Sequence, residues 1–173
     1  MLVLAERIGV SSASIVAILG SAGVAIGLAW QGSLSNFAGG MIILFSHPFS
    51  RGDYIITPKA EGIVDTIGII YTILLTPDNK RISIPNGTLA NDVITNVTAN
   101  DIRRIDIKVG VSYNTDIRKA KKLIKEAFDE NGLILKNNDI VSYVDDLASS
   151  AVILGGMAWC KTGDYLTAKW AIV

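Results

Sequence analysis

The feature that most constrains this chain is a stretch near its N-terminus that lacks charged side chains. Between Arg7 and Arg51 the sequence contains no Asp, Glu, Lys or Arg. As a helix rising about 1.5 Å per residue, the segment from Ile8 to Ala29 would cross a hydrocarbon core roughly 30 Å thick. The alternative is a buried helix of a soluble protein, but such helices seldom run this long without charge. We therefore predict one membrane-spanning helix. A signal peptide would be shorter and would begin with basic residues.

Small residues outnumber Leu and Ile in this segment, which predicts close contact with other helices rather than with lipid alone. A helix advances about 100° per residue, so residues at spacings of three and four share a side. The predicted ridge consists of Ala17, Ser21 and Ala25, and the predicted groove consists of Gly20, Gly23 and Gly27. Val24 and Leu28 lie between these two sets as an apolar stripe.

A ridge and a groove that flank one stripe would let identical helices pack side by side. Such a contact is head-to-tail and can close into a ring. Inside the ring, Val24 and Leu28 would form two stacked apolar collars, which exclude water and therefore ions. The alternative is a two-helix contact between small residues, with Val24 and Leu28 as ordinary packing residues.

Polar residues follow the predicted span and indicate a kink. Gln31 and Gly32 begin this segment, and we expect Ser33 or Asn36 to satisfy backbone groups that the kink frees. The next apolar stretch, from Phe37 to Phe45, is too short to span a bilayer. It is expected to form an amphipathic helix along the membrane boundary or against the soluble region. Residues 1–50 would then make up the membrane part of the chain.

Residues 51–100 have the composition of a small β-barrel. The expected strands are rich in Ile, Val, Thr and Tyr and cover Tyr54–Thr57, Ile63–Leu75 and Arg81–Ile84. We expect turns at residues 77–80 and at Pro85-Asn86-Gly87. Gly52, Gly62 and Gly68 suit tight corners or bulges.

Residues 101–173 predict a partial α+β domain. Alternating apolar residues suggest a strand from Ile102 to Tyr113, followed by a helix from Asp116 to Asn131 that Asn114 or Thr115 would cap. Two strands, at 141–147 and 151–160, and a helix from residue 165 to residue 173 complete the pattern. The order β-α-β-β-α is most of a ferredoxin-like, split βαβ fold, without its closing strand.

The charges and reactive residues favour no enzyme, cofactor or nucleic-acid partner. Lys and Arg total 16 and Asp and Glu total 16, so no overall field would attract nucleic acid. The single cysteine, Cys160, cannot form an internal disulfide or a cysteine-built metal site. His47, the only histidine, follows an apolar helix and suits its end better than catalysis. Asp145 and Asp146 are adjacent on a strand and would point to opposite faces, so they do not form a catalytic carboxylate pair.

Several motifs give the chain a resemblance to the small-conductance mechanosensitive ion channel family. The run from Gly20 to Asn36 is similar to that family's third transmembrane helix and its kink. Pro48-Phe49 with Gly52-Asp53-Tyr54, and then Ile84-Pro85-Asn86-Gly87, resemble the β-domain that follows. The resemblance covers nearly the whole chain.

This resemblance implies a membrane channel that opens under tension and releases ions and small solutes during hypo-osmotic shock. It implies a homoheptamer in the inner membrane, with the Sm-like β-domain and the αβ-domain forming a hollow cytoplasmic vestibule. Val24 and Leu28 match the positions of the family's pore constriction, and Gly32 matches its kink. The ridge and groove residues match its helix contact. The two earlier transmembrane helices and the end of the αβ-domain do not occur in this sequence.

The chain departs from the family pattern at four of these positions. Val24 stands where the family usually has Leu, which would widen that collar slightly, and Ser21 replaces an expected Ala. His47 and Ser50 stand where basic residues often flank the Pro-Phe pair. These departures bear on conductance and on the tension threshold. A membrane-anchored scaffold that forms a ring without conducting is the other function that the pattern allows.

Overall fold

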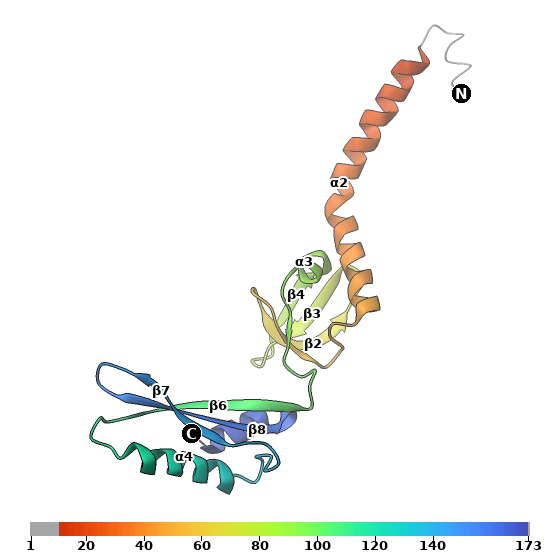
Figure 1. Cartoon of the computed structure of the whole chain (residues 1–173). Coiled ribbons are helices and arrows are strands. Elements are labelled where there is room, and N and C mark those ends of the chain that lie inside the picture. The colour runs from red at the N-terminus through yellow and green to blue at the C-terminus, as the bar shows by residue number, and fades with distance from the viewer. Residues whose placement is uncertain (1–10, 173) are drawn as a thin grey trace. The chain divides into compact units, whose positions relative to one another are not determined.

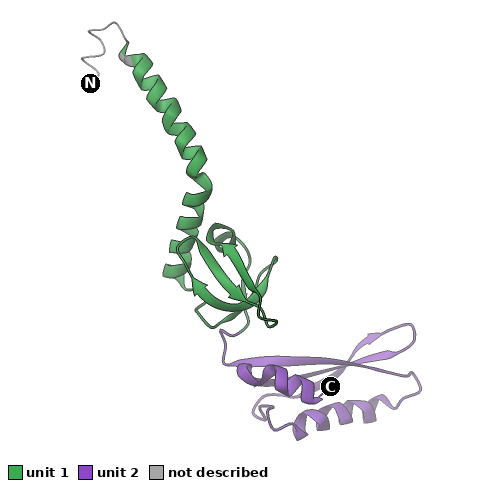
Figure 2. Cartoon of the chain, turned by 180° about the vertical axis from the view of Figure 1, so that it is seen from behind, with its two compact units in different colours: residues 1–97 green, residues 98–173 purple. Residues whose placement is uncertain are grey.

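The computed structural model describes residues 11–172, which form two compact units. One unit ends at Val97 and the other begins at Thr98 (Figure 2). The first unit contains a long helix and a β-domain, and the second is an αβ-domain (Figure 1). An apolar helix followed by β-rich domains is the fold class that the sequence predicts.

The long helix α2 (Ser12–Ser46) covers both apolar stretches without interruption. The side chain of Ser11 caps its start by accepting a hydrogen bond from the Ser14 N–H. His47 ends it in the left-handed region, with φ 47°, and donates its backbone N–H to the Ile43 carbonyl. The second apolar stretch is therefore a continuation of the same helix. The helix axis changes direction partway along its length, as both views show (Figures 1 and 2).

The β-domain is a small, curved antiparallel sheet with the strand order β4-β3-β2-β1-β5. Its elements are β1 (Tyr54–Ile56), β2 (Glu61–Ile67), β3 (Tyr71–Leu75), β4 (Arg81–Pro85), α3 (Asn86–Asn91) and β5 (Thr95–Asn96). The register shifts between Val64 and Thr66, which bends the sheet locally. Its core is formed by large apolar side chains that are at most 8% exposed: Ile43, Phe49, Ile55, Val64, Leu74, Ile84 and Leu89.

Two details of the β-domain correct the sequence prediction. The single strand expected over Ile63–Leu75 is two strands, β2 and β3, joined by a turn that begins at Gly68. The turn expected at Pro85-Asn86-Gly87 is the start of the short helix α3. Pro85 precedes α3 as its N-cap, where the missing N–H interrupts no hydrogen bond within the helix. Gly52 has φ 95°, a conformation that favours glycine, so its predicted role at a tight corner is confirmed.

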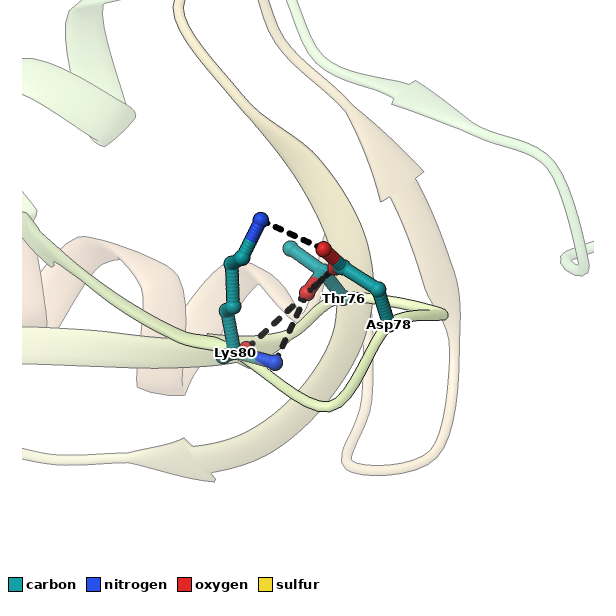
Figure 3. A network of polar contacts seen from close by, with 3 residues as sticks. All are labelled: Thr76, Asp78 and Lys80. Carbon is teal, nitrogen blue, oxygen red and sulfur yellow. Dashed lines mark hydrogen bonds and ion pairs between the residues drawn. The ribbon is translucent and has the colours of Figure 1, made fainter.

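The tip of the β3–β4 hairpin is held by a polar network of Thr76, Asp78 and Lys80 (Figure 3). The Thr76 hydroxyl donates to the Asp78 carboxylate at 2.5 Å and accepts from the Lys80 N–H at 2.9 Å. Lys80 Nζ lies 2.5 Å from Asp78 Oδ2. The Lys80 ammonium, followed by the Thr76 hydroxyl, lowers the pKa of Asp78 from its usual value. Asn79 takes a positive φ of 64° at this turn.

The αβ-domain has a three-stranded antiparallel sheet in the order β6-β8-β7, with β8 in the centre. Its elements are β6 (Ile102–Val111), α4 (Ile117–Glu130), β7 (Val141–Leu147), β8 (Val152–Lys161), the 3-10 helix η1 (Thr162–Asp164) and α5 (Tyr165–Ile172). This order is that of the first three strands of a split βαβ fold. The cap of α4 is Asp116, whose carboxylate accepts from the Arg118 and Lys119 N–H groups. The predicted caps, Asn114 and Thr115, were therefore wrong. A carboxylate can accept both bonds at a helix N-terminus.

Two adjacent glycines of β8 allow close packing on both faces of this sheet. A Cβ at Gly156 would lie 2.7 Å from side-chain atoms of Ile124 and Phe128, so α4 packs against this point of the sheet. A Cβ at Gly155 would collide with the ring of Tyr143, its cross-strand neighbour on β7. Lys108, paired with Gly155 from the other side, places its ammonium 2.7 Å from Asp145 on β7. This carboxylate raises the pKa of Lys108.

Candidate functional site: the membrane helix and its junction with the β-domain

The N-terminal half of α2 exposes its apolar side chains. Its most apolar stretch has a mean hydropathy of 1.9 and is not buried inside the chain, and the helix is long and apolar enough to cross a membrane. Val24 is 64% exposed and Leu28 is 66% exposed. A helix that is this apolar and this uncovered requires an apolar environment, either lipid or other helices.

The small residues of the predicted ridge and groove also lie open in the single chain. A Cβ added at Gly20, Gly23 or Gly27 would meet no atom within 4 Å. The Ser21 hydroxyl donates to the Ile18 carbonyl at 2.9 Å, so this ridge residue uses its own helix as a hydrogen-bond partner. The surface is therefore suited to an apolar contact, but one chain does not bring the ridge to the groove. Both roles stay predictions.

The residues predicted for the kink do not all lie in the same environment. Gln31 and Gly32 are exposed, and a Cβ at Gly32 would meet no atom within 4 Å. Asn36 is half-buried, and its Oδ1 accepts a hydrogen bond from the Gly87 N–H at 3.0 Å. The expected partner of Asn36 was a backbone group of its own helix, and the structure gives this oxygen a partner in α3. The assignment of the kink to Gly32 stays a prediction.

The C-terminal half of α2 lies against the β-domain through glycines that leave no room for a side chain. A Cβ at Gly39 would be 2.5 Å from the Asn86 carbonyl oxygen, and a Cβ at Gly40 would overlap the Ile69 carbonyl oxygen. A Cβ at Gly87 would be 2.8 Å from Asn36 Oδ1. Backbone therefore meets backbone at this point. We call this contact of Asn36, Gly39 and Gly40 with Ile69, Asn86 and Gly87 the junction.

A fully buried asparagine organises the β-domain side of the junction. Asn86 Oδ1 accepts from the Thr72 hydroxyl at 2.8 Å, and its Nδ2 donates to the Gly68 carbonyl at 2.8 Å. Both side-chain groups are thus satisfied, as burial of an amide requires. Ile43, one helical turn beyond Gly39 and Gly40, is 1% exposed and joins the core of the β-domain. The junction therefore continues directly into a packed apolar core.

The segment after α2 fastens the helix end to the sheet. Phe49 is 1% exposed in the β-domain core. Asp53 Oδ2 accepts from the Ser50 N–H at 2.8 Å and from Asn96 Nδ2 at 2.9 Å. This carboxylate therefore ties the loop that leaves α2 to β5, the last strand of the first unit.

Sequence reasoning missed the junction, although a signal for it was present. Asn36, Gly39, Gly40 and Ile43 share one face of a helix at spacings of three and four. A polar residue and two adjacent glycines on one face indicate a close contact with another backbone. The partner, Asn86-Gly87, lies far along the chain and was interpreted as a turn.

The described residues show no arrangement for metal or thiol chemistry. Among residues 11–172, no group of three or more His, Cys, Asp and Glu side chains could hold a metal ion. Cys160 is buried, and its burial raises the pKa of the thiol, which disfavours the reactive thiolate. His47 is exposed at the C-terminal end of α2.

Comparison with known proteins identifies two matching domain families. Residues 32–99 match the mechanosensitive ion channel β-domain, and residues 105–173 match the C-terminal domain of the mechanosensitive ion channel MscS. An uncharacterized MscS family protein of Buchnera aphidicola (Baizongia pistaciae) is 39% identical over 96% of this chain and 59% of its own length. A small-conductance mechanosensitive channel of Helicobacter pylori is 35% identical over 92% of this chain and 58% of its own length.

Solved structures show the same fold. The closed-state crystal structure of Helicobacter pylori MscS aligns with a TM-score of 0.89 and 32% identity, over 99% of this chain and 68% of that one. A cryo-EM structure of Arabidopsis thaliana MSL1 aligns with a TM-score of 0.81 and 25% identity, over 99% of this chain and 64% of that one. The chain spans less than two thirds of the length of the two curated relatives described above.

Proposed function

We propose a function for this chain, which belongs to the MscS family of mechanosensitive channels. In this proposal the chain is the pore-lining and vestibule-forming part of a tension-gated channel subunit. The proposal rests on the two different environments of helix α2. One half of this helix is apolar and uncovered, and the other half is joined to a β-domain by backbone contact. A helix of this kind can line a pore and transmit its movement to a soluble domain.

The proposed pore is a ring of seven identical subunits. The ridge of one α2 helix packs into the groove of the next, and the open space around Gly20, Gly23 and Gly27 supports this packing. Val24 and Leu28 then face the axis as two apolar collars, one helical turn apart. Their exposure of about two thirds in the single chain is consistent with a position that only the assembled ring covers.

The proposed division of labour follows the sequence. Residues 1–50 supply the membrane part, residues 51–100 the β-domain and residues 101–173 the αβ-domain. We place the span in the inner membrane, in contact with its lipids, and both soluble domains in the cytoplasm. The family is a channel family, and we propose no enzymatic activity or cofactor for this chain.

In this proposal, membrane tension favours a state in which the α2 helices tilt and rotate. The collars widen, become wet and let ions and then small solutes pass during hypo-osmotic shock.

The junction has a mechanical consequence. Its backbone contacts leave no room for α2 to slide along the β-domain, so the C-terminal half of α2 moves with that domain. Bending of the helix is then confined to the part N-terminal to Asn36.

Patch recording of the full-length protein under graded suction tests this function. Stepwise currents that open with pressure support a channel. A protein that forms a homoheptamer in the membrane but stays silent at every pressure below lysis would instead support the non-conducting ring scaffold.

A further inference from the structure

Helix α4 carries its charges in two blocks that oppose its own dipole. The N-terminal block contains only cations: Arg118, Lys119, Lys121, Lys122 and Lys125. The C-terminal block contains only anions: Glu126, Asp129 and Glu130. A helix dipole favours anions at the start and cations in the last turn, and within α4 itself neither turn has such a charge, so the N-cap Asp116 is the favourable charge at its start.

The two blocks lie on the solvent side of the helix. Ile124 and Phe128 form the buried side against the sheet. Apart from Lys121, which is half-buried, all of the charged side chains are exposed. Because Arg118 and Lys122 are four residues apart, and Lys121 and Lys125 likewise, like charges also crowd one another. Within residues 11–172, the one ion pair between the blocks joins Lys122 Nζ and Glu126 Oε1 at 3.5 Å.

The order of the two charged blocks is unfavourable in the isolated helix. A partner that places anions beside the basic block and cations beside the acidic block would offset this repulsion. A second copy of this chain is such a partner, because its acidic block complements the basic block of the first. A contact of this kind is heterologous when each copy offers a different block to each neighbour, and it can be repeated around a closed ring. The domain as a whole is nearly balanced in charge, which argues against a purely anionic partner such as nucleic acid. Thr98–Val173 has 11 Lys and Arg and 10 Asp and Glu.

We propose that α4 is an electrostatic contact between neighbouring subunits, in which the basic block of one subunit faces the acidic block of the next. The contact would select the neighbour and its orientation more than it would add affinity. This inference rests on the homo-oligomer of the proposed function and adds the surface that its αβ-domains use.

Two charge-reversed subunits test the contact. In the acidic subunit, Arg118, Lys119 and Lys122 are replaced by Glu, while Lys121 and Lys125 are kept. In the all-basic subunit, Glu126, Asp129 and Glu130 are replaced by Lys. Both sets bring the charges into agreement with the helix dipole, so neither is expected to weaken α4 itself.

The two full-length subunits are co-expressed with different tags, and the composition of the oligomers is measured by native mass spectrometry. We expect oligomers that contain only one of the two variants to fall about tenfold or more below a random distribution, because like neighbours repel and unlike neighbours attract. This depletion should shrink in about 1 M salt, where the screening length falls to roughly 3 Å.

The matched control reverses three exposed cations elsewhere, with Lys59, Lys136 and Lys161 replaced by Glu. Co-expressed with the all-basic subunit, this control should mix at random. A random composition for the two α4 variants would overturn the inference and leave the proposed channel intact, whereas an unaltered protein that is monomeric would overturn the homo-oligomer itself. If a triple variant is not recovered, the single variants Lys122→Glu and Glu126→Lys are co-expressed instead. The composition of their oligomers is measured and interpreted as for the triple variants.

Discussion

Asn36 and Gly87 are 51 positions apart in the chain, yet the Gly87 N–H donates a 3.0 Å hydrogen bond to the Asn36 side-chain oxygen. This bond crosses from the long helix to the start of α3. It lies beside the backbone contacts of Gly39 and Gly40, so it aligns two elements that are already too close for any side chain between them. The orientation of α2 on the β-domain therefore depends on a few small residues.

Replacing Asn36 with Ala should loosen the junction. The Gly87 N–H loses its side-chain acceptor in a half-buried place, which costs about 1–3 kcal/mol. Hydrogen exchange at the Gly87 amide should accelerate, by up to roughly tenfold for each 1.4 kcal/mol. Ser33→Ala, at an exposed position of the same helix, is the control and should leave this exchange rate unchanged. Equal protection of Gly87 in the Asn36 variant and the unaltered protein would contradict the assignment.

Gly40→Ala should destabilise the first unit, because the added methyl group meets the backbone carbonyl of Ile69 rather than a movable side chain. Overpacking of this kind costs about 1–3 kcal/mol. Thermal unfolding in detergent should show a lower Tm. Gly163→Ala adds the same methyl group where no atom lies within 4 Å, and its Tm should match that of the unaltered protein. A Gly40 variant as stable as this control would mean that the junction is looser than described.

Leu28→Asp should produce a leaky channel. In the proposed ring it replaces one apolar collar with carboxylates, which hydrate the closed pore. Cells that express the full-length variant should grow poorly, and patches should carry current without suction. Leu28→Ile keeps the collar apolar and should behave normally. Normal growth together with an electrically silent patch for Leu28→Asp would count strongly against a pore position for this residue.

Gly156→Ala should destabilise the αβ-domain, because α4 packs directly against this glycine. The new methyl group would crowd the side chains of Ile124, Phe128 and Ile107, at an expected cost of about 1–3 kcal/mol. Gly110→Ala is the matched control on the neighbouring strand, where the nearest atom would be 3.6 Å away at ordinary contact distance. Chemical unfolding of the two variants should separate them. Equal unfolding midpoints would contradict this packing.

Lys80→Met should raise the pKa of Asp78 toward its ordinary value, because the Lys80 ammonium is the largest cause of its lowering. A lowered carboxyl pKa contributes stability above the unfolded-state value, and this contribution is lost as the pH falls through the folded-state pKa. In the unaltered protein the hairpin tip should therefore lose this support only in acid, whereas Lys80→Met should lack it at every pH. An NMR titration of the Asp78 carboxyl carbon measures the change, with Lys59→Met as the control. An unchanged titration in Lys80→Met would show that Lys80 is not the cause.

The sequence by itself determined the elements whose signals are local. The length of the first charge-free apolar stretch indicated a helix, and the alternation in Ile102–Val111 indicated a strand, because each signal lies within the segment itself. The small residues around Val24 and Leu28 likewise predicted a packing surface. The order of strands in the αβ-domain followed from the same patterns, since a β-α-β-β sequence has few compact topologies.

The tertiary structure alone decided what depends on distant partners. Asn86-Gly87 has the local composition of a turn, yet it starts α3. The Asn86 side chain forms hydrogen bonds with Thr72 and Gly68 inside the β-domain, and the Gly87 N–H forms one with Asn36. The continuation of α2 past its polar residues was decided in the same way, since Ile43 is buried only where the sheet meets it. Side-chain periodicity reports which face of an element is apolar. It does not report which backbone lies against that face, and at the junction that backbone sets the geometry.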